Sequence, residues 1–169
     1  MAEPNTISIR KAELEDVAEI TRIFNEAIEN STANFHKEAK STDYMWRWLA
    51  SRQKHHPVLI AESGDSLLGW ASLGVYDPRT AFNTTAEFSV YVDETARGRG
   101  VGIQLAKAAI QAGKDASLHT IIARVTADNE ASLKLHEKAG FEKAGHLKQV
   151  GQKFDQWLDV CVMQYLLVQ

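Results

Sequence analysis

The apolar residues of this chain switch between two spacings, and the order of the switches limits the folds that it can adopt. Alternating or continuous apolar runs predict strands, whereas apolar residues three and four positions apart predict helices. The predicted elements are a strand at 7–10, a helix carrying Val17 to Ile28, a helix carrying Met45 to Leu49, strands at 58–61, 67–75 and 88–93, a helix carrying Val101 to Ala112, a strand at 120–125, a helix at 130–139, and strands at about 142–150 and 157–166. This order predicts an α+β fold, in which a mixed, mostly antiparallel sheet of about seven strands is flanked by helices. The chain shows no linker and no repeat, so we expect one domain over residues 1–169.

Composition narrows the classes of function. The formal net charge is −3, from 19 basic and 22 acidic residues, so charge gives no reason to expect nucleic acid or a membrane as a partner. The start, Met1 to Asn5, lacks the basic and apolar segments of a leader peptide, and no apolar stretch approaches about 18 residues. The single cysteine, Cys161, excludes an internal disulfide and is expected to be buried, and the histidines lack metal-ligand spacing. We therefore expect a cytoplasmic protein without a metal.

A glycine-rich segment, Arg97-Gly98-Arg99-Gly100-Val101-Gly102, joins a predicted strand to a predicted helix. Glycine lets the backbone adopt positive φ and approach a ligand closely, and the free N–H groups at the start of a helix attract anions. The segment lacks the Gly-Lys-Ser/Thr ending of a nucleotide triphosphate loop and the setting of a dinucleotide-binding βαβ unit. By itself it fits a diphosphate site and a plain strand-to-helix connection equally well.

In its context, this segment resembles a motif of the GNAT superfamily of N-acetyltransferases, in which an Arg/Gln-x-x-Gly-x-Gly/Ala turn wraps the pyrophosphate of acetyl-CoA. A second GNAT motif, an asparagine-led helix that ends in Gly-Phe, is matched by residues 129–141, and the order of elements also agrees. Residues 31–35, 87–92 and 151–159 further resemble the branch that acetylates phosphinothricin and methionine sulfoximine. The resemblance covers nearly the whole chain, and this branch is typically dimeric.

The resemblance implies acetyl-CoA as the co-substrate and assigns a set of contacts to it. The backbone of residues 90–92 would pair with the pantetheine arm, and one of its N–H groups would stabilise charge on the thioester oxygen. Asn129, Ser132 and His136 share one helix face and would also contact the cofactor, although a solvent-facing polar stripe is the alternative. The implied acetyl-CoA contacts are Val90, Tyr91, Val92, Arg97, Gly98, Arg99, Gly100, Val101, Gly102, Asn129, Ser132 and His136.

The resemblance also implies catalytic and substrate-binding residues. Glu87 would accept a proton from the amine, and His136 would either protonate the leaving thiolate or only contact the cofactor. Arg79 is the first candidate to bind a substrate carboxylate and Lys153 is the second, although a plain surface arginine is the alternative. Phe35, Tyr76, Phe82 and Trp157 could form apolar walls or pack in the core or a dimer interface. The implied substrate contacts are Phe35, Leu73, Gly74, Val75, Tyr76, Arg79, Phe82, Glu87 and Lys153.

The expected function is transfer of the acetyl group of acetyl-CoA to the α-amino group of a small amino acid or analogue. Phosphinothricin, methionine sulfoximine and methionine sulfone are the types that the resemblance implies, with direct attack in a ternary complex and a homodimeric enzyme. Two other functions remain open at this point. The chain could acetylate a protein N-terminus, or it could be a CoA-binding module without activity.

Overall fold

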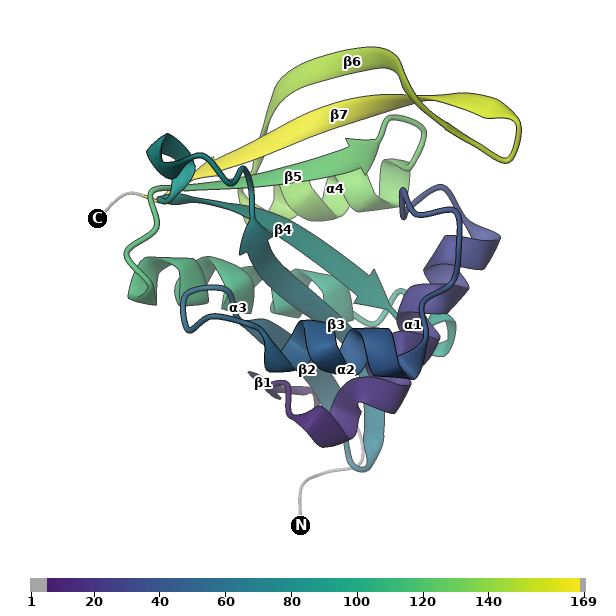
Figure 1. Cartoon of the computed structure of the whole chain (residues 1–169), viewed down its shortest axis with the longest axis vertical. Coiled ribbons are helices and arrows are strands. Elements are labelled where there is room, and N and C mark those ends of the chain that lie inside the picture. The colour runs from purple at the N-terminus through teal and green to yellow at the C-terminus, as the bar shows by residue number, and fades with distance from the viewer. Residues whose placement is uncertain (1–5, 168–169) are drawn as a thin grey trace.

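Within residues 6–167, which the computed structural model describes, the chain forms a seven-stranded sheet with two helices on each face (Figure 1). The strands are β1 (Ser8–Lys11), β2 (Val58–Ser63), β3 (Ser66–Val75), β4 (Thr85–Val92), β5 (Thr120–Thr126), β6 (Glu142–Lys153) and β7 (Gln156–Leu166). The helices are α1 (Val17–Asn30), α2 (Thr42–Ala50), α3 (Val101–Asp115) and α4 (Glu130–Ala139). The predicted α+β fold and the predicted order of elements are confirmed. Residues 1–5, on which the expectation of no leader peptide rests, lie outside the described residues.

The sheet opens at its centre, between β4 and β5. Its strand order is β1-β2-β3-β4-β5-β7-β6, and β4 with β5 is the one parallel pair among the described strands. The two strands pair only between residues 85–87 and 120–122, and then they diverge (Figure 1). Beyond Glu87, the edge of β4 that faces β5 therefore has no strand partner within residues 6–167. Backbone groups on such an edge are available to bind a ligand.

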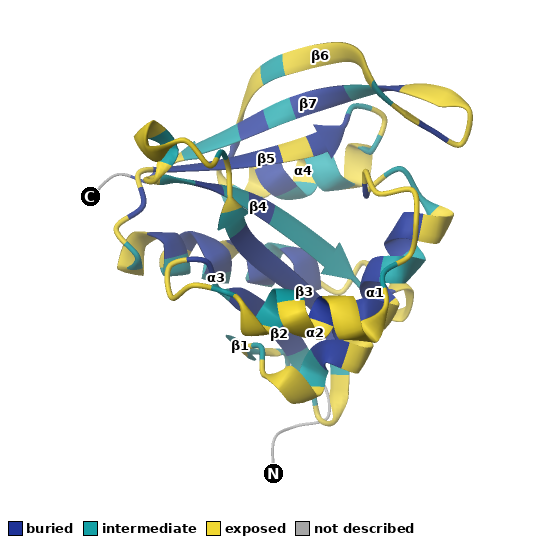
Figure 2. Cartoon of the chain, viewed as in Figure 1, coloured by how far each residue is buried: buried dark blue, intermediate teal, exposed yellow. Residues whose placement is uncertain are grey.

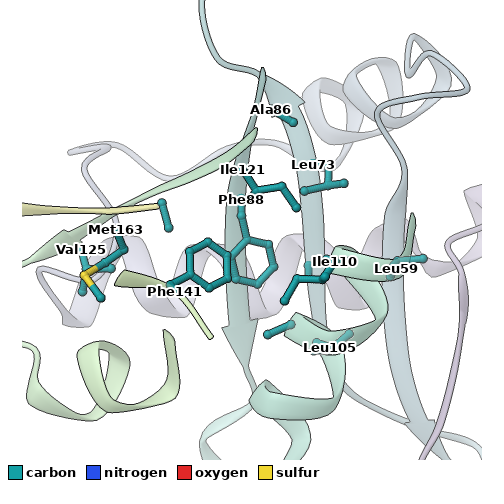
Figure 3. Close-up of a cluster of buried hydrophobic side chains, with 14 of the residues drawn as sticks. Leu59, Leu73, Ala86, Phe88, Leu105, Ile110, Ile121, Val125, Phe141 and Met163 are labelled. Carbon is teal, nitrogen blue, oxygen red and sulfur yellow. The ribbon is translucent and has the colours of Figure 1, made fainter. Parts of the chain in front are cut away.

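The larger part of the core lies between the sheet and the α3/α4 layer, and Figure 2 shows buried residues along one side of α3 and along β3 and β5. Figure 3 shows the Phe88 and Phe141 rings at its centre, stacked with their centroids 5.8 Å apart. A second, smaller cluster packs α1 and α2 on the other face, where the Trp70 ring lies 5.5 Å from that of Phe24 and 5.6 Å from that of Trp48. The central strands are thus packed on both faces, which gives a rigid support for a site.

Two boundaries differ from the sequence prediction. The residues just before the first helix, which was predicted to carry Val17 to Ile28, form a separate 3₁₀ turn, Leu14–Asp16. Asp16 causes this difference because it accepts a hydrogen bond from the Glu13 N–H at 2.7 Å and pairs with Arg10 at 2.8 Å. β6 runs to Lys153 instead of about residue 150, because Gln149 adopts a φ of 50° and the strand register shifts there, which hides the alternation.

Candidate active site

One face of the sheet carries a pocket because side chains alternate along each strand. Every second residue of β3 and β4 points to the side on which α1 and α2 lie. The opposing pairs on this face are Trp70 with Tyr91, Ser72 with Ser89, and Gly74 with Glu87. All six residues line a pocket of about 570 Å³, and residues of α1, of α2, of the 31–41 loop, and of β5, β6 and β7 form other parts of its walls. A pocket of this size suits a small molecule.

Two charged side chains meet in the wall of this pocket. The Arg124 guanidinium donates two hydrogen bonds to the Glu87 carboxylate, from Nε to Oε1 and from Nη2 to Oε2, both at 2.7 Å. The hydrogen bonds to Glu87 raise the pKa of Arg124. The Glu87 side chain is 23% exposed and that of Arg124 is 49% exposed, so a ligand in the pocket can reach both. The sequence analysis predicted Glu87 as a site residue but not Arg124. The signal that could have pointed to Arg124 is its charge within the otherwise apolar strand β5.

The predicted glycine-rich turn lies against the start of α3. Gly98 and Gly100 have φ values of 75° and 79°, in the left-handed region that favours glycine. Gly102 has a different role, because a Cβ at this position would clash with Cδ1 of Leu135. Gly102 therefore lets α4 pack closely against α3. The first N–H groups of α3 have no partner inside the helix, so this turn can bind an anion such as a diphosphate.

The two arginines of the turn contribute unequally. Arg97 lines the adjacent groove and pairs with Glu26 of α1 at 3.0 Å, whereas Arg99 is exposed and does not line the groove. The charge of Arg97 is thus already balanced by Glu26. The backbone at the start of α3 is therefore the main anion-binding feature of this segment.

A groove of about 820 Å³ begins at the turn and follows the free edge of β4 through Val90, Tyr91 and Val92. A smaller cavity of about 60 Å³ lies between β4, β5 and α4. This cavity shares Asn129 and Ser132 with the groove, and it shares Glu87 and Arg124 with the pocket. The three spaces therefore adjoin along a single path from the glycine-rich turn to the Glu87–Arg124 pair.

The polar face predicted for the second motif lines the small cavity. The Asn129 side chain accepts a hydrogen bond from the Ser132 N–H at 3.1 Å and caps the start of α4. His136 is 3% exposed, and its Nδ1 lies 2.7 Å from the carbonyl oxygen of Ser132. A carbonyl oxygen can only accept, so Nδ1 carries the proton and Nε2 of the neutral ring is an acceptor. Burial lowers the pKa of His136, which favours this neutral form.

Stability should depend on pH through the buried histidines. Burial lowers the pKa of both His56 and His136. Each of these histidines binds a proton more readily in the unfolded chain than in the folded protein. The folded state is therefore most stable above the unfolded pKa of about 6.5, and it loses stability as the pH falls toward the lower pKa values of the folded state. Each unit of pKa lowering is worth about 1.4 kcal/mol. We expect the melting temperature to fall between about pH 7.5 and pH 5 in scanning calorimetry, and a flat or rising profile would contradict this account.

Only part of the predicted substrate set lies in the pocket. Phe35, Gly74 and Val75 line it together with Glu87. Leu73 is fully buried on the opposite face of β3, in the core against α3 (Figure 3). Its side chain points away from the pocket because Leu73 alternates with Gly74 along the strand.

The remaining predicted contacts lie elsewhere in the chain. Arg79 pairs with Asp77 at 2.7 Å and stacks on Phe82, and the Phe82 ring packs against Tyr76. Lys153 is buried, and its Nζ donates to the carbonyl oxygen of Asn34 at 2.7 Å, which ties the 31–41 loop to the β6–β7 hairpin. Trp157 is 62% exposed on that hairpin. Neither of the two predicted cations, Arg79 and Lys153, lines the pocket.

Arg52, which follows α2, is a further cation in the pocket lining. Its guanidinium donates to the carbonyl oxygens of His56, at 3.0 Å, and of Leu73, and it stacks 4.8 Å from the centre of the Trp48 ring. These contacts hold the segment after α2 against the end of β3. Arg52 therefore supports the pocket wall, and part of its hydrogen-bonding capacity is already used by the protein.

Three further sequence expectations concern metals, membranes and the cysteine. Among residues 6–167, no three His, Cys, Asp or Glu side chains gather closely enough to hold a metal ion. The same part of the chain contains no helix that is long and apolar enough to cross a membrane. Cys161 is 1% exposed in β7, which confirms that the thiol is buried.

Comparison with protein families gives one match that spans most of the chain. Residues 9–162 match the family described as "Acetyltransferase (GNAT) domain". Among curated proteins, the chain is 38% identical over 159 residues to the L-methionine sulfoximine/L-methionine sulfone acetyltransferase of Pseudomonas aeruginosa. That alignment covers 93% of this chain and 92% of the relative.

Among solved structures, the chain is also similar to acetyltransferases. The structure of yncA from Salmonella typhimurium, solved with its cofactor acetyl-CoA, has a TM-score of 0.93 and 34% identity, and the match covers 96% of this chain and 95% of that one. The ribosomal-protein-alanine N-acetyltransferase of Brucella melitensis has a TM-score of 0.92 and 39% identity, and the match covers 94% of this chain and 99% of that one.

Proposed function

This chain belongs to the GNAT acetyltransferase family, and on that premise we propose that it acetylates the α-amino group of a small amino acid or analogue. The observation that carries this proposal is the path of adjoining spaces from the glycine-rich turn, along the free edge of β4, to Glu87 in a pocket of about 570 Å³. The groove suits the long, anionic acetyl-CoA molecule, and the pocket suits a short zwitterion. The name of the Pseudomonas aeruginosa relative supports methionine sulfone and methionine sulfoximine as substrates, and the sequence resemblance supports phosphinothricin.

Glu87 is the proposed general base. An α-amine is protonated near neutral pH, so the Glu87 carboxylate first accepts a proton from the ammonium group. The amine nitrogen then bonds to the acetyl carbon and gives up a second proton, the carbon–sulfur bond breaks, and the CoA thiolate takes up one proton and leaves as a thiol. An unpaired N–H on the free edge of β4 stabilises the charge that builds on the acetyl oxygen.

His136 is better suited to position the cofactor contacts than to donate the proton. Its Nδ1 proton is held by the Ser132 carbonyl, and its ring packs 5.5 Å from Phe88 and 5.3 Å from Phe141. Tyr91 lines all three spaces and accepts a hydrogen bond from the Asn34 side chain at 2.8 Å. Desolvation raises the pKa of Tyr91 to about 12, so its hydroxyl stays protonated and can donate.

Acetylation of a protein N-terminus is the second candidate function. The 39% identical structural relative from Brucella melitensis, whose name specifies that reaction, favours it. The walls of the pocket oppose it. The 31–41 loop is fixed by hydrogen bonds from Thr126 to Thr32 and from Lys153 to Asn34, and the loop closes the side of the pocket next to Phe35.

Release of free thiol from acetyl-CoA tests these functions against one another. The amine panel contains methionine sulfone, methionine sulfoximine, phosphinothricin, ordinary amino acids and short peptides. We expect kcat/KM for at least one amino acid analogue to exceed that for every peptide by about tenfold or more, because the 31–41 loop walls one side of the pocket and hinders a continuing chain. Faster turnover of peptides would support N-terminal acetylation. Tight CoA binding with no turnover of any amine would support a non-catalytic module.

The homodimer and the cytoplasmic location expected from the sequence stay predictions, as does the single domain over residues 1–169. The homodimer that the resemblance implies is supported by exposed apolar side chains on the β6–β7 hairpin, since such patches mark interfaces. These side chains are Leu147, Val150, Phe154 and Trp157.

A further inference from the structure

We propose that the Glu87–Arg124 ion pair recognises the charged head of an α-amino acid substrate, with Glu87 taking the ammonium group and Arg124 taking the carboxylate. This inference rests on the proposed function and names the group that selects its substrates. An α-amino acid carries both charges on a single carbon atom, so the two protein groups that bind them must be close neighbours. Glu87 and Arg124 are in direct contact, with both of their hydrogen bonds at 2.7 Å.

The position of the pair matches the path of the reaction. Both residues line the pocket, and both also line the small cavity that leads toward Asn129 and the acetyl-CoA groove. Arg124 lies two residues beyond Ile122, which is the last residue of β5 that pairs with β4. Arg124 therefore reaches back across the opening between the strands. A substrate held by the pair would have its amine at the mouth of that opening, where the thioester arrives.

The other charged groups of the pocket do not fit this task. Glu87 is the one carboxylate among the described residues that line the pocket, so the ammonium group has a single matching partner there. Arg52 is engaged with the carbonyl oxygens of His56 and Leu73. Partial desolvation and the nearby charges of Lys40 and Lys153 lower the pKa of His36, which favours its neutral form. Arg79 and Lys153 lie outside the lining.

Substrate binding would exchange partners without leaving a charge unmatched. The Arg124 guanidinium presents a planar pair of N–H groups to Glu87, and the same geometry accepts any carboxylate. When the zwitterion enters, its carboxylate takes the guanidinium and its ammonium group takes the Glu87 carboxylate. An amine without a carboxylate offers Arg124 no replacement for Glu87, and it therefore competes poorly with the existing ion pair.

The test compares an amino acid that the wild type acetylates, such as methionine sulfone, with its carboxamide in the wild type and in Arg124→Gln. We expect the wild type to prefer the acid, and the ratio of kcat/KM for acid over amide to fall at least about tenfold in Arg124→Gln. The ratio cancels any effect of the substitution on Glu87 that both substrates share. Arg124→Lys should keep part of the preference, because lysine retains the charge but not the bidentate geometry.

Two further variants make the result specific. Arg47→Gln removes an exposed arginine that pairs with Asp43 on α2, and it should leave the ratio at its wild-type value. Arg79→Gln tests the cation that the sequence favoured. An unchanged ratio in Arg124→Gln, or a ratio lost only in Arg79→Gln, would overturn the inference. If the proposed function itself were wrong, the wild type would acetylate no amino acid at all, which distinguishes that outcome from a wrong assignment of Arg124.

Discussion

Glutamine in place of Glu87 is expected to lower kcat by about 10²–10⁴-fold, which is the usual contribution of a positioned general base. The KM for acetyl-CoA should change by less than about threefold, because Glu87 lines the substrate pocket and the small cavity but not the acetyl-CoA groove. The glutamine side chain has nearly the same shape and can still accept one hydrogen bond from Arg124, so the wall of the pocket should persist. Steady-state thiol release with a good amino acid substrate measures both parameters.

The pH dependence of the Glu87→Gln defect separates a base from a merely structural residue. As the pH rises toward the pKa of the amine, more substrate arrives unprotonated and needs no base, so the defect should shrink. Glu62→Gln is the matched control, because Glu62 is also a strand carboxylate that pairs with an arginine, Arg10, at 3.1 Å, and it lies outside the lining of all three spaces. Full turnover of Glu87→Gln at neutral pH would show that another group accepts the proton.

The sequence predicted the order of elements correctly, and the features proposed to bind acetyl-CoA could be proposed from sequence because both depend on local patterns. The glycine-rich turn combines residues that are adjacent in the chain, and Gly98 and Gly100 adopt the left-handed conformation that such a turn needs. The face formed by Asn129, Ser132 and His136 also follows from spacing within one helix. Gly102 shows the limit of this reasoning, because its close contact with Leu135 joins two helices and cannot be read from either one.

The substrate side was predicted less completely because its contacts join distant segments. Arg79 precedes β4 in the chain, which suggested the pocket, yet its own neighbour Asp77 holds it at 2.7 Å. Arg124 is 37 residues away from Glu87 in sequence, and only the parallel pairing of β4 with β5 brings them together. The available signal in the sequence was that Arg124 is a charged residue inside an apolar strand. In the structure, Arg124 is an exposed residue between two buried neighbours in β5.

Alanine in place of Gly100 is expected to raise the KM for acetyl-CoA by about 10- to 100-fold, while kcat at saturating acetyl-CoA stays within a few fold. Gly100 is the cap of α3 with a φ of 79°, and a left-handed conformation costs other residues about 1–2 kcal/mol. If the turn relaxes to avoid that cost, the N–H groups at the start of α3 no longer converge on the diphosphate. Each lost hydrogen bond to a charged group is worth about 1.5–3 kcal/mol.

Gly64→Ala is the control that separates this effect from general destabilisation. Gly64 also has a positive φ, 58°, and it lies in the turn between β2 and β3, outside the lining of all three spaces. An added Cβ meets nothing within 4 Å at Gly64, and at Gly100 its nearest neighbour is Cγ2 of Ile103 at 3.9 Å, so the two substitutions differ little in steric cost. Both variants should lose similar thermal stability, but only Gly100→Ala should weaken acetyl-CoA binding. Equal KM values in the two variants would mean that the conformation of this turn does not create the diphosphate site.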